Sequence, residues 1–221
     1  MKRVLLAGVV ALALATPAYA QMKFEASVLG GYTFSEGLKG DPVVTPSGTY
    51  DSIDVKSGGS FGLSFGFVME SGGEIGFSWS RQFSELSVKG VTSRTLGDMN
   101  IDGYHGYFAY NFMPDSKVRP YVSIGFGATN YGAVPFTTVA GAGAEVPSAT
   151  RFSTTWGFGM KAWANDNFGF RAGMQWTPTY ITSEASGWWC DPYWGCYIVG
   201  DSKYSNQFQI SGGVTFRFGG N

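Results

Sequence analysis

The sequence alternates between apolar and polar residues in segments of about ten residues, and this period of two recurs from residue 24 to residue 218. Successive side chains of a β-strand point to opposite faces, so each segment is predicted to form a strand with one apolar and one polar face. The last segment shows the pattern most clearly, with Phe208, Ile210, Gly212, Val214, Phe216 and Phe218 on one parity and Gln207, Gln209, Ser211, Gly213, Thr215 and Arg217 on the other.

Eight such segments follow one another, and the connections between them are alternately short and long. The seven earlier segments fall within residues 24–34, 60–70, 74–80, 104–112, 122–129, 152–162 and 168–177. The short connections are 71–73, 113–120 and 165–167, and the long ones are 35–59, 84–100, 130–150 and 178–203. Consecutive strands with such short turns pair antiparallel. No connection has the character of an interdomain linker, so we expect one all-β domain over residues 21–221.

The first twenty residues have the features of a cleaved export signal. Lys2 and Arg3 precede an apolar run over residues 4–15, and the small-residue site Ala18-Tyr19-Ala20 follows it. The run is shorter than the roughly 20 residues of a membrane-spanning helix, so the mature chain is expected to begin at Gln21. Loss of the two basic residues leaves 13 basic against 16 acidic residues. This mild acidity argues against a nucleic-acid partner, which requires a basic face.

Two architectures are consistent with the strands, a water-soluble β-sandwich and a closed barrel in a membrane. A soluble domain carries about 25% charged residues, whereas this chain carries 14%. The polar parity is also rich in small residues, which suit a narrow barrel interior where side chains from all strands converge. These residues include Gly62, Gly66, Gly76, Gly125, Gly127, Gly157, Gly159, Gly173 and Gly213. We therefore favour the membrane barrel, with apolar side chains facing lipid.

A barrel assigns the charged and the aromatic residues to different places. A Lys or Arg that faces lipid at mid-membrane costs about 2–4 kcal/mol, and charges on the inward parity avoid that cost. The predicted lumen charges are Glu25, Glu70, Glu74, Lys161, Arg171 and Arg217. Buried charges are costly unless paired, so they are expected either to form a plug or to line a narrow path. The predicted interface girdle consists of Trp79, Tyr110, Phe112, Trp176 and Phe218.

Three segments resemble the small bacterial outer-membrane β-barrel superfamily, which includes the OmpA membrane domain, OmpX and opacity-type porin-like proteins. They are PYVSIGFG at 120–127, RAGM at 171–174 and GVTFRF at 213–218. The resemblance implies an eight-stranded antiparallel transmembrane up-and-down β-barrel with short periplasmic turns and four long extracellular loops. The implied partners are outer-membrane lipid, lipopolysaccharide and, during insertion, the barrel-assembly machinery. Such barrels usually end on an aromatic residue, whereas this chain continues to Gly219-Gly220-Asn221.

The two cysteines of the chain, Cys190 and Cys196, both lie in the last long connection. An exported protein matures in an oxidising compartment, so a disulfide between them is expected. Two thiols without a nearby histidine are too few ligands for a metal site. The bridge would either rigidify the loop or hold an aromatic tip for an extracellular partner. That tip comprises Trp188, Trp189, Tyr193 and Trp194.

His105 is the only histidine of the chain. A catalytic base needs a nucleophile and an orienting acid within hydrogen-bond reach, and the serine spacing singles out no nucleophile. We therefore expect no catalytic residues, no metal and no cofactor. The expected function is a structural or surface-interaction role with a lumen filled by side chains. A narrow channel or small hydrophobic-compound transporter is the first alternative, and a membrane-embedded lipid-modifying enzyme is the second.

Overall fold

The computed structural model describes residues 22–36, 38–45, 48–90, 93–137, 141, 143–180, 190–191, 195–196 and 204–219. The predicted export signal lies outside these residues, as do Trp188, Trp189, Tyr193 and Trp194 of the predicted aromatic tip. No helix in the described part of the chain is long and apolar enough to cross a membrane.

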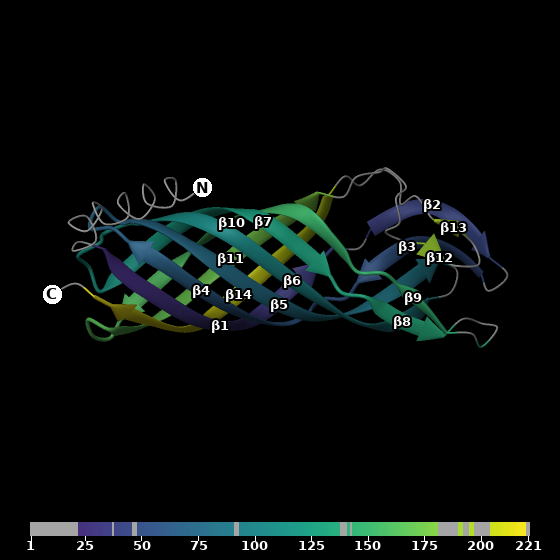
Figure 1. Cartoon of the computed structure of the whole chain (residues 1–221), viewed down its shortest axis with the longest axis horizontal. Helices are drawn as coiled ribbons and strands as arrows, with labels where there is room; N and C mark the ends of the chain where they lie inside the picture. Colours follow the sequence, from purple (N-terminus) through teal and green to yellow (C-terminus); the bar gives the residue numbers. More distant parts are fainter. Residues whose placement is uncertain are drawn as a thin grey trace, which may run out of the picture.

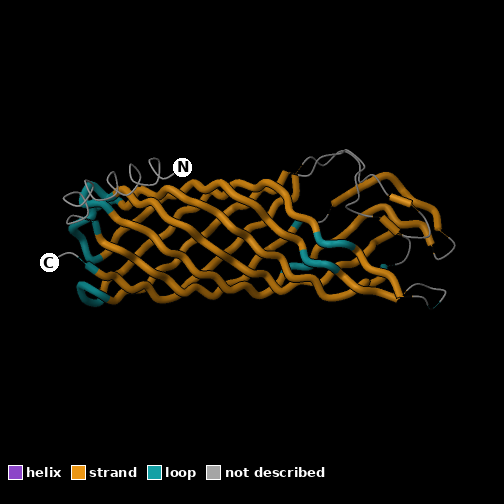
Figure 2. The backbone as a smooth tube through the Cα atoms, in the orientation of Figure 1, coloured by secondary structure: helices purple, strands orange, loops and turns teal. Residues whose placement is uncertain are grey.

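Eight long strands close into one barrel (Figures 1 and 2). They are β1 (Lys23–Ser35), β4 (Gly58–Val68), β5 (Gly73–Gly90), β6 (Arg94–Asn111), β7 (Val118–Tyr131), β10 (Ala149–Trp163), β11 (Phe168–Tyr180) and β14 (Tyr204–Phe218). Each strand pairs antiparallel with the strands that precede and follow it in this series, and β14 pairs with β1 to close the ring. The predicted eight-stranded antiparallel barrel is therefore confirmed.

The outer face of the barrel is apolar and the inner face is polar. Phe77, Phe126 and Phe158 are 46%, 57% and 56% exposed on the outside. Their polar neighbours on the opposite parity, such as Thr155 and Thr215, are buried. A water-soluble protein rarely exposes such a continuous apolar surface. The arrangement is that of a transmembrane barrel, in which lipid is the solvent of the outer face.

Beyond one end of the barrel, the strands continue into an extension, which we define as the described residues within 38–55, 84–100 and 131–149. The two 18-residue strands β5 and β6 run on into this extension. The end of β5 also pairs with β3 (Gly48–Val55), which forms a hairpin with β2 (Leu38–Thr45). A second hairpin joins β8 (Val134–Thr137) to β9 (Gly143–Val146). Figure 1 shows these elements at the end of the barrel opposite the short turns.

The extension has an apolar core of its own. Leu86 and Val134 are fully buried there, with Val55, Met99 and Tyr131 packed around them. On β5 and β6 these apolar side chains occupy the inward parity, which carries polar residues lower in the barrel. The expectation that residues 84–100 form a loop is wrong, because β5 runs to Gly90 and β6 begins at Arg94. The expected loops 35–59 and 130–150 likewise contain the β2–β3 and β8–β9 strand pairs. Along β5 and β6 the pattern was missed because the apolar residues change there from the outward to the inward parity. Outside the lipid, the strands bury apolar residues inward, as a soluble sheet does.

Candidate functional site

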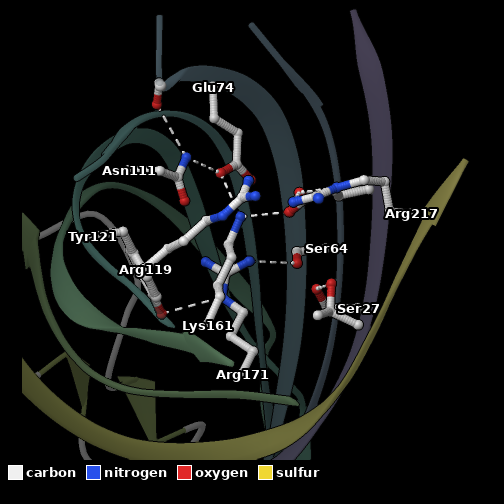
Figure 3. A network of polar contacts seen from close by, with 12 residues as sticks. Ser27, Ser64, Glu74, Asn111, Arg119, Tyr121, Lys161, Arg171 and Arg217 are labelled. Atoms are coloured by element: carbon white, nitrogen blue, oxygen red, sulfur yellow. Dashed lines mark hydrogen bonds and ion pairs between the residues drawn. The ribbon is translucent and has the colours of Figure 1, made fainter. Parts of the chain in front are cut away.

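The most concentrated chemistry lies inside the barrel at its short-turn end, where side chains from four strands meet (Figure 3). The Lys161 Nζ atom on β10 lies 2.6 Å from a Glu25 carboxylate oxygen and 2.7 Å from a Glu74 carboxylate oxygen. Arg217 on β14 forms a second ion pair with Glu25, at 2.7 Å. All four side chains are buried. We call Glu25, Glu74, Lys161 and Arg217 the lumen network.

The strand register explains why these ions must pair across the lumen. Lys161 lies directly opposite Arg119 on β7 and directly opposite Arg171 on β11. Like charges side by side on one face of a sheet destabilise it. The compensating carboxylates come from β1 and β5, which do not neighbour β10 in the sheet. Lys161 therefore extends across the interior at this end of the barrel.

Neutral donors complete the hydrogen bonding of Glu74. The Tyr107 hydroxyl donates to one carboxylate oxygen at 2.8 Å, and the Asn111 side-chain amide donates to the other at 2.9 Å. Two glycines leave the room that Tyr107 occupies. A Cβ atom at either Gly66 or Gly76 would lie 2.7 Å from the Tyr107 hydroxyl oxygen. The small residues of the polar parity thus make space for larger side chains that cross the lumen.

Arg171 is held differently from the other two buried cations. Its Nε atom donates to the Tyr121 hydroxyl at 3.1 Å, and its Nη1 atom donates to the Ser64 hydroxyl at 3.1 Å. Its guanidinium carbon also lies 4.6 Å from the centre of the Tyr121 ring. Gly159 and Gly173 leave space for that tyrosine, because a Cβ at either would lie within 2.7 Å of its hydroxyl oxygen. Among the described residues, no carboxylate forms an ion pair with Arg171.

Two polar cavities lie between the lumen network and the extension. The first has a volume of about 50 Å³ and is lined by Arg171, Tyr121 and several hydroxyl groups. The second, of about 20 Å³, is lined by Gln82, Gln207 and Ile101 among others. A buried water needs roughly 10–15 Å³ on this measure, so both cavities have room for water. Ile101 also belongs to the apolar core of the extension, so the second cavity borders that core.

The prediction that Glu70 is a lumen charge is wrong. This residue is exposed in the turn after β4, whereas the other five predicted lumen charges are buried in the barrel. The alternation of β4 ends at Val68, so parity no longer determines the direction of a side chain two residues later.

The predicted girdle residues lie at both ends of the apolar face. Tyr110, Phe112 and Phe218 are exposed near the short turns. At the other end, the indole nitrogen of Trp79 donates to Asp102 and that of Trp176 donates to Asn206, both at 3.2 Å. An indole with an apolar body and a satisfied N–H suits a membrane–water interface.

The structure brings His105 to a serine that the sequence did not single out. The His105 Nε2 atom lies 2.8 Å from the Ser153 hydroxyl oxygen. That oxygen also accepts a hydrogen bond from Thr129, which in turn accepts one from Thr179. In the described part of the chain, no carboxylate joins this row of hydroxyl groups. The contact crosses from β6 to β10, so only the barrel geometry could reveal it.

The two cysteines occupy a short ladder of their own. Cys190 in β12 (Cys190–Asp191) lies opposite Cys196 in β13 (Gly195–Cys196). This backbone pairing is compatible with the predicted disulfide, which stays a prediction.

Comparison with known proteins supports the fold. No family model matches the sequence, and no curated protein was found as a relative. Among solved structures, the outer membrane protein OprG from Pseudomonas aeruginosa is similar, with a TM-score of 0.61, 12% identity, and coverage of 90% of this chain and 96% of that one. Neisserial surface protein A (NspA) is also similar, with a TM-score of 0.51, 16% identity, and coverage of 90% and 97%. The chain therefore has the fold of the small bacterial outer-membrane β-barrel proteins.

Proposed function

We propose that this outer-membrane barrel is closed to solutes, has no enzymatic role and uses its extracellular extension as a contact surface. The observation that supports the proposal is that side chains occupy the interior at two levels. Lys161, Glu25 and Glu74 meet across the short-turn end, and the apolar core of the extension fills the other end. An eight-stranded barrel has an interior just wide enough for side chains to fill.

The secondary structure and the ion pairs of the extension support a surface role. The extension consists of paired strands, and the Lys89–Asp54 ion pair at 2.7 Å joins β5 to β3. Lys56, the residue after β3, forms a second surface ion pair with Glu85 of β5 at 3.0 Å. Rigid, preorganised surfaces lose less entropy on binding than loose loops do. NspA, one of the proteins with a similar structure, is also named a surface protein.

The absence of an enzymatic role is inferred from the position of His105 and Ser153. They lie inside the barrel between the two closed ends, and the adjacent cavity of about 20 Å³ is too small for a lipid substrate. Hydrolysis of a lipid would also need groups that stabilise the developing negative charge beside the nucleophile. We assign His105 a structural role in the hydrogen bonding of the lumen.

Single-channel conductance of refolded protein in a planar bilayer tests the closed lumen. Folding is verified independently by the shift in gel mobility between unheated and boiled samples. A silent bilayer from folded protein is the expected result. Reproducible discrete current steps would refute closure and favour a narrow channel through the two cavities.

The contact surface is tested on whole cells that express a variant in which residues 38–53 are replaced by a short turn. We expect these cells to lose a surface-binding property of wild-type cells while their envelope integrity is unchanged. Retention of every such property by a folded variant would contradict the surface role.

A further inference from the structure

We propose that the barrel lumen binds one small monovalent inorganic anion, of the size of chloride, beside the guanidinium group of Arg171. The site is the cavity of about 50 Å³ that Arg171 lines. The proposal does not depend on the surface role suggested above, because it concerns only the interior of the barrel.

The first argument is a count of buried charge. The buried ions of the short-turn half of the lumen are three cations, Lys161, Arg171 and Arg217, and two carboxylates, Glu25 and Glu74. The half-buried Arg119 lies beside Lys161 on the same inward face and adds a further positive charge. The buried Asp102 is already bound to Arg81 on the outer side of the barrel. Among the described residues, these buried ions therefore leave at least one positive charge in excess. Protonation of the single histidine would only add to it.

The second argument is how the two carboxylates are shared. One oxygen of Glu25 pairs with Lys161 and the other with Arg217. Glu74 pairs with Lys161 at 2.7 Å, and its attraction for Arg171 acts over a longer distance without an ion pair. Arg171 thus depends on hydroxyl groups for its direct contacts. A buried charge that is not neutralised is strongly unfavourable, so a counterion next to this arginine would stabilise the barrel.

The third argument is the chemistry of the cavity wall. Arg171 is 8% exposed and borders the cavity, whose wall also includes the hydroxyl groups of Ser64, Ser123 and Thr155. Hydroxyl and guanidinium groups donate hydrogen bonds, and a hydroxyl rotates to suit the acceptor. The wall therefore offers donors to an anion around one fixed positive charge. No carboxylate borders this cavity within the described residues.

The size of the cavity selects the class of anion. Since a water molecule needs roughly 10–15 Å³ on this measure, a volume of about 50 Å³ holds a halide and two or three waters. A large organic anion such as gluconate would not fit. The site is therefore assigned to chloride and its close analogues, and bromide serves as a probe that X-ray diffraction can identify.

The direct test is anomalous diffraction from crystals of protein refolded in bromide. Refolding in bromide gives the anion access to the cavity whether or not the lumen is open in the folded barrel. We expect a bromide peak in the cavity within contact distance of the Arg171 guanidinium group. The peak should be absent in R171M and present in the control R119M, which removes a positive charge outside the cavity. A wild-type cavity without bromide, or a peak that persists in R171M, would overturn the proposal.

A solution measurement keeps the test decisive if R171M does not fold. The variant S64D places a carboxylate where the Ser64 hydroxyl now accepts from Arg171, so it supplies an internal counterion. For the wild-type protein, the unfolding equilibrium constant should fall by up to about tenfold for each tenfold increase in chloride. S64D should lose this dependence. An equal response of the wild-type protein to gluconate at matched ionic strength would show general screening and refute the site.

Discussion

Replacement of Lys161 by methionine tests whether the lumen network stabilises the barrel. Lys161 is 1% exposed and pairs with two carboxylates that are equally inaccessible. Removal of one partner from a buried ion pair costs about 3–5 kcal/mol, because an uncompensated charge stays buried. Although K161M breaks two ion pairs, the loss in the free energy of unfolding should stay within about 3–5 kcal/mol. Glu25 keeps Arg217, and Glu74 keeps its hydrogen bond from Tyr107.

The assay is reversible urea unfolding in phospholipid vesicles, followed by tryptophan fluorescence. The matched control is K56M, which breaks an exposed ion pair to Glu85 and should change the free energy of unfolding by less than about 1 kcal/mol. The double variant K161M/E74Q should recover part of the loss, since it neutralises Glu74, the carboxylate that K161M leaves without an ion pair. Equal effects of K161M and K56M would refute the stabilising role of the network.

Three further predictions concern other parts of the barrel, with the free energy of unfolding as the measurement. F158R places a charge on the lipid-facing side of β10 and should destabilise the barrel by about 2–4 kcal/mol, and a neutral result would contradict the membrane assignment. G31A should cost about 1–3 kcal/mol because its Cβ would lie 2.1 Å from a backbone oxygen of β14, whereas G30A meets nothing within 4 Å and should be nearly neutral. Y107F removes the hydroxyl donor to Glu74 and should cost about 1–3 kcal/mol, and a loss equal to that of G30A would argue against this hydrogen bond.

The spanning strands were predictable from the sequence because each one repeats a single rule, apolar outward and polar inward. This rule also predicts that Lys161 and Arg171 point inward, since each lies on the polar parity of its strand. It fails in the extension, where Leu86 and Met99 are apolar and buried inside. The solvent outside the strand changes there from lipid to water, and parity alone does not show where that change occurs.

The partners inside the lumen were not predictable. Lys161 contacts a residue 136 positions away in the sequence, Glu25. Which side chains meet across a barrel depends on the stagger between strands, and the stagger is a property of the closed sheet. The contact of His105 with Ser153 was missed for the same reason.

The length of β5 and β6 determines how far the extension rises above the membrane. Eighteen residues at about 3.3 Å each, tilted by about 40°, rise roughly 45 Å, whereas the lipid-facing band of such barrels is about 25 Å tall. The β2–β3 hairpin pairs with the end of β5, so we expect it roughly 20 Å above the lipid. Antibodies against this hairpin should label intact cells, whereas antibodies against the strand segments beside Trp79 should not.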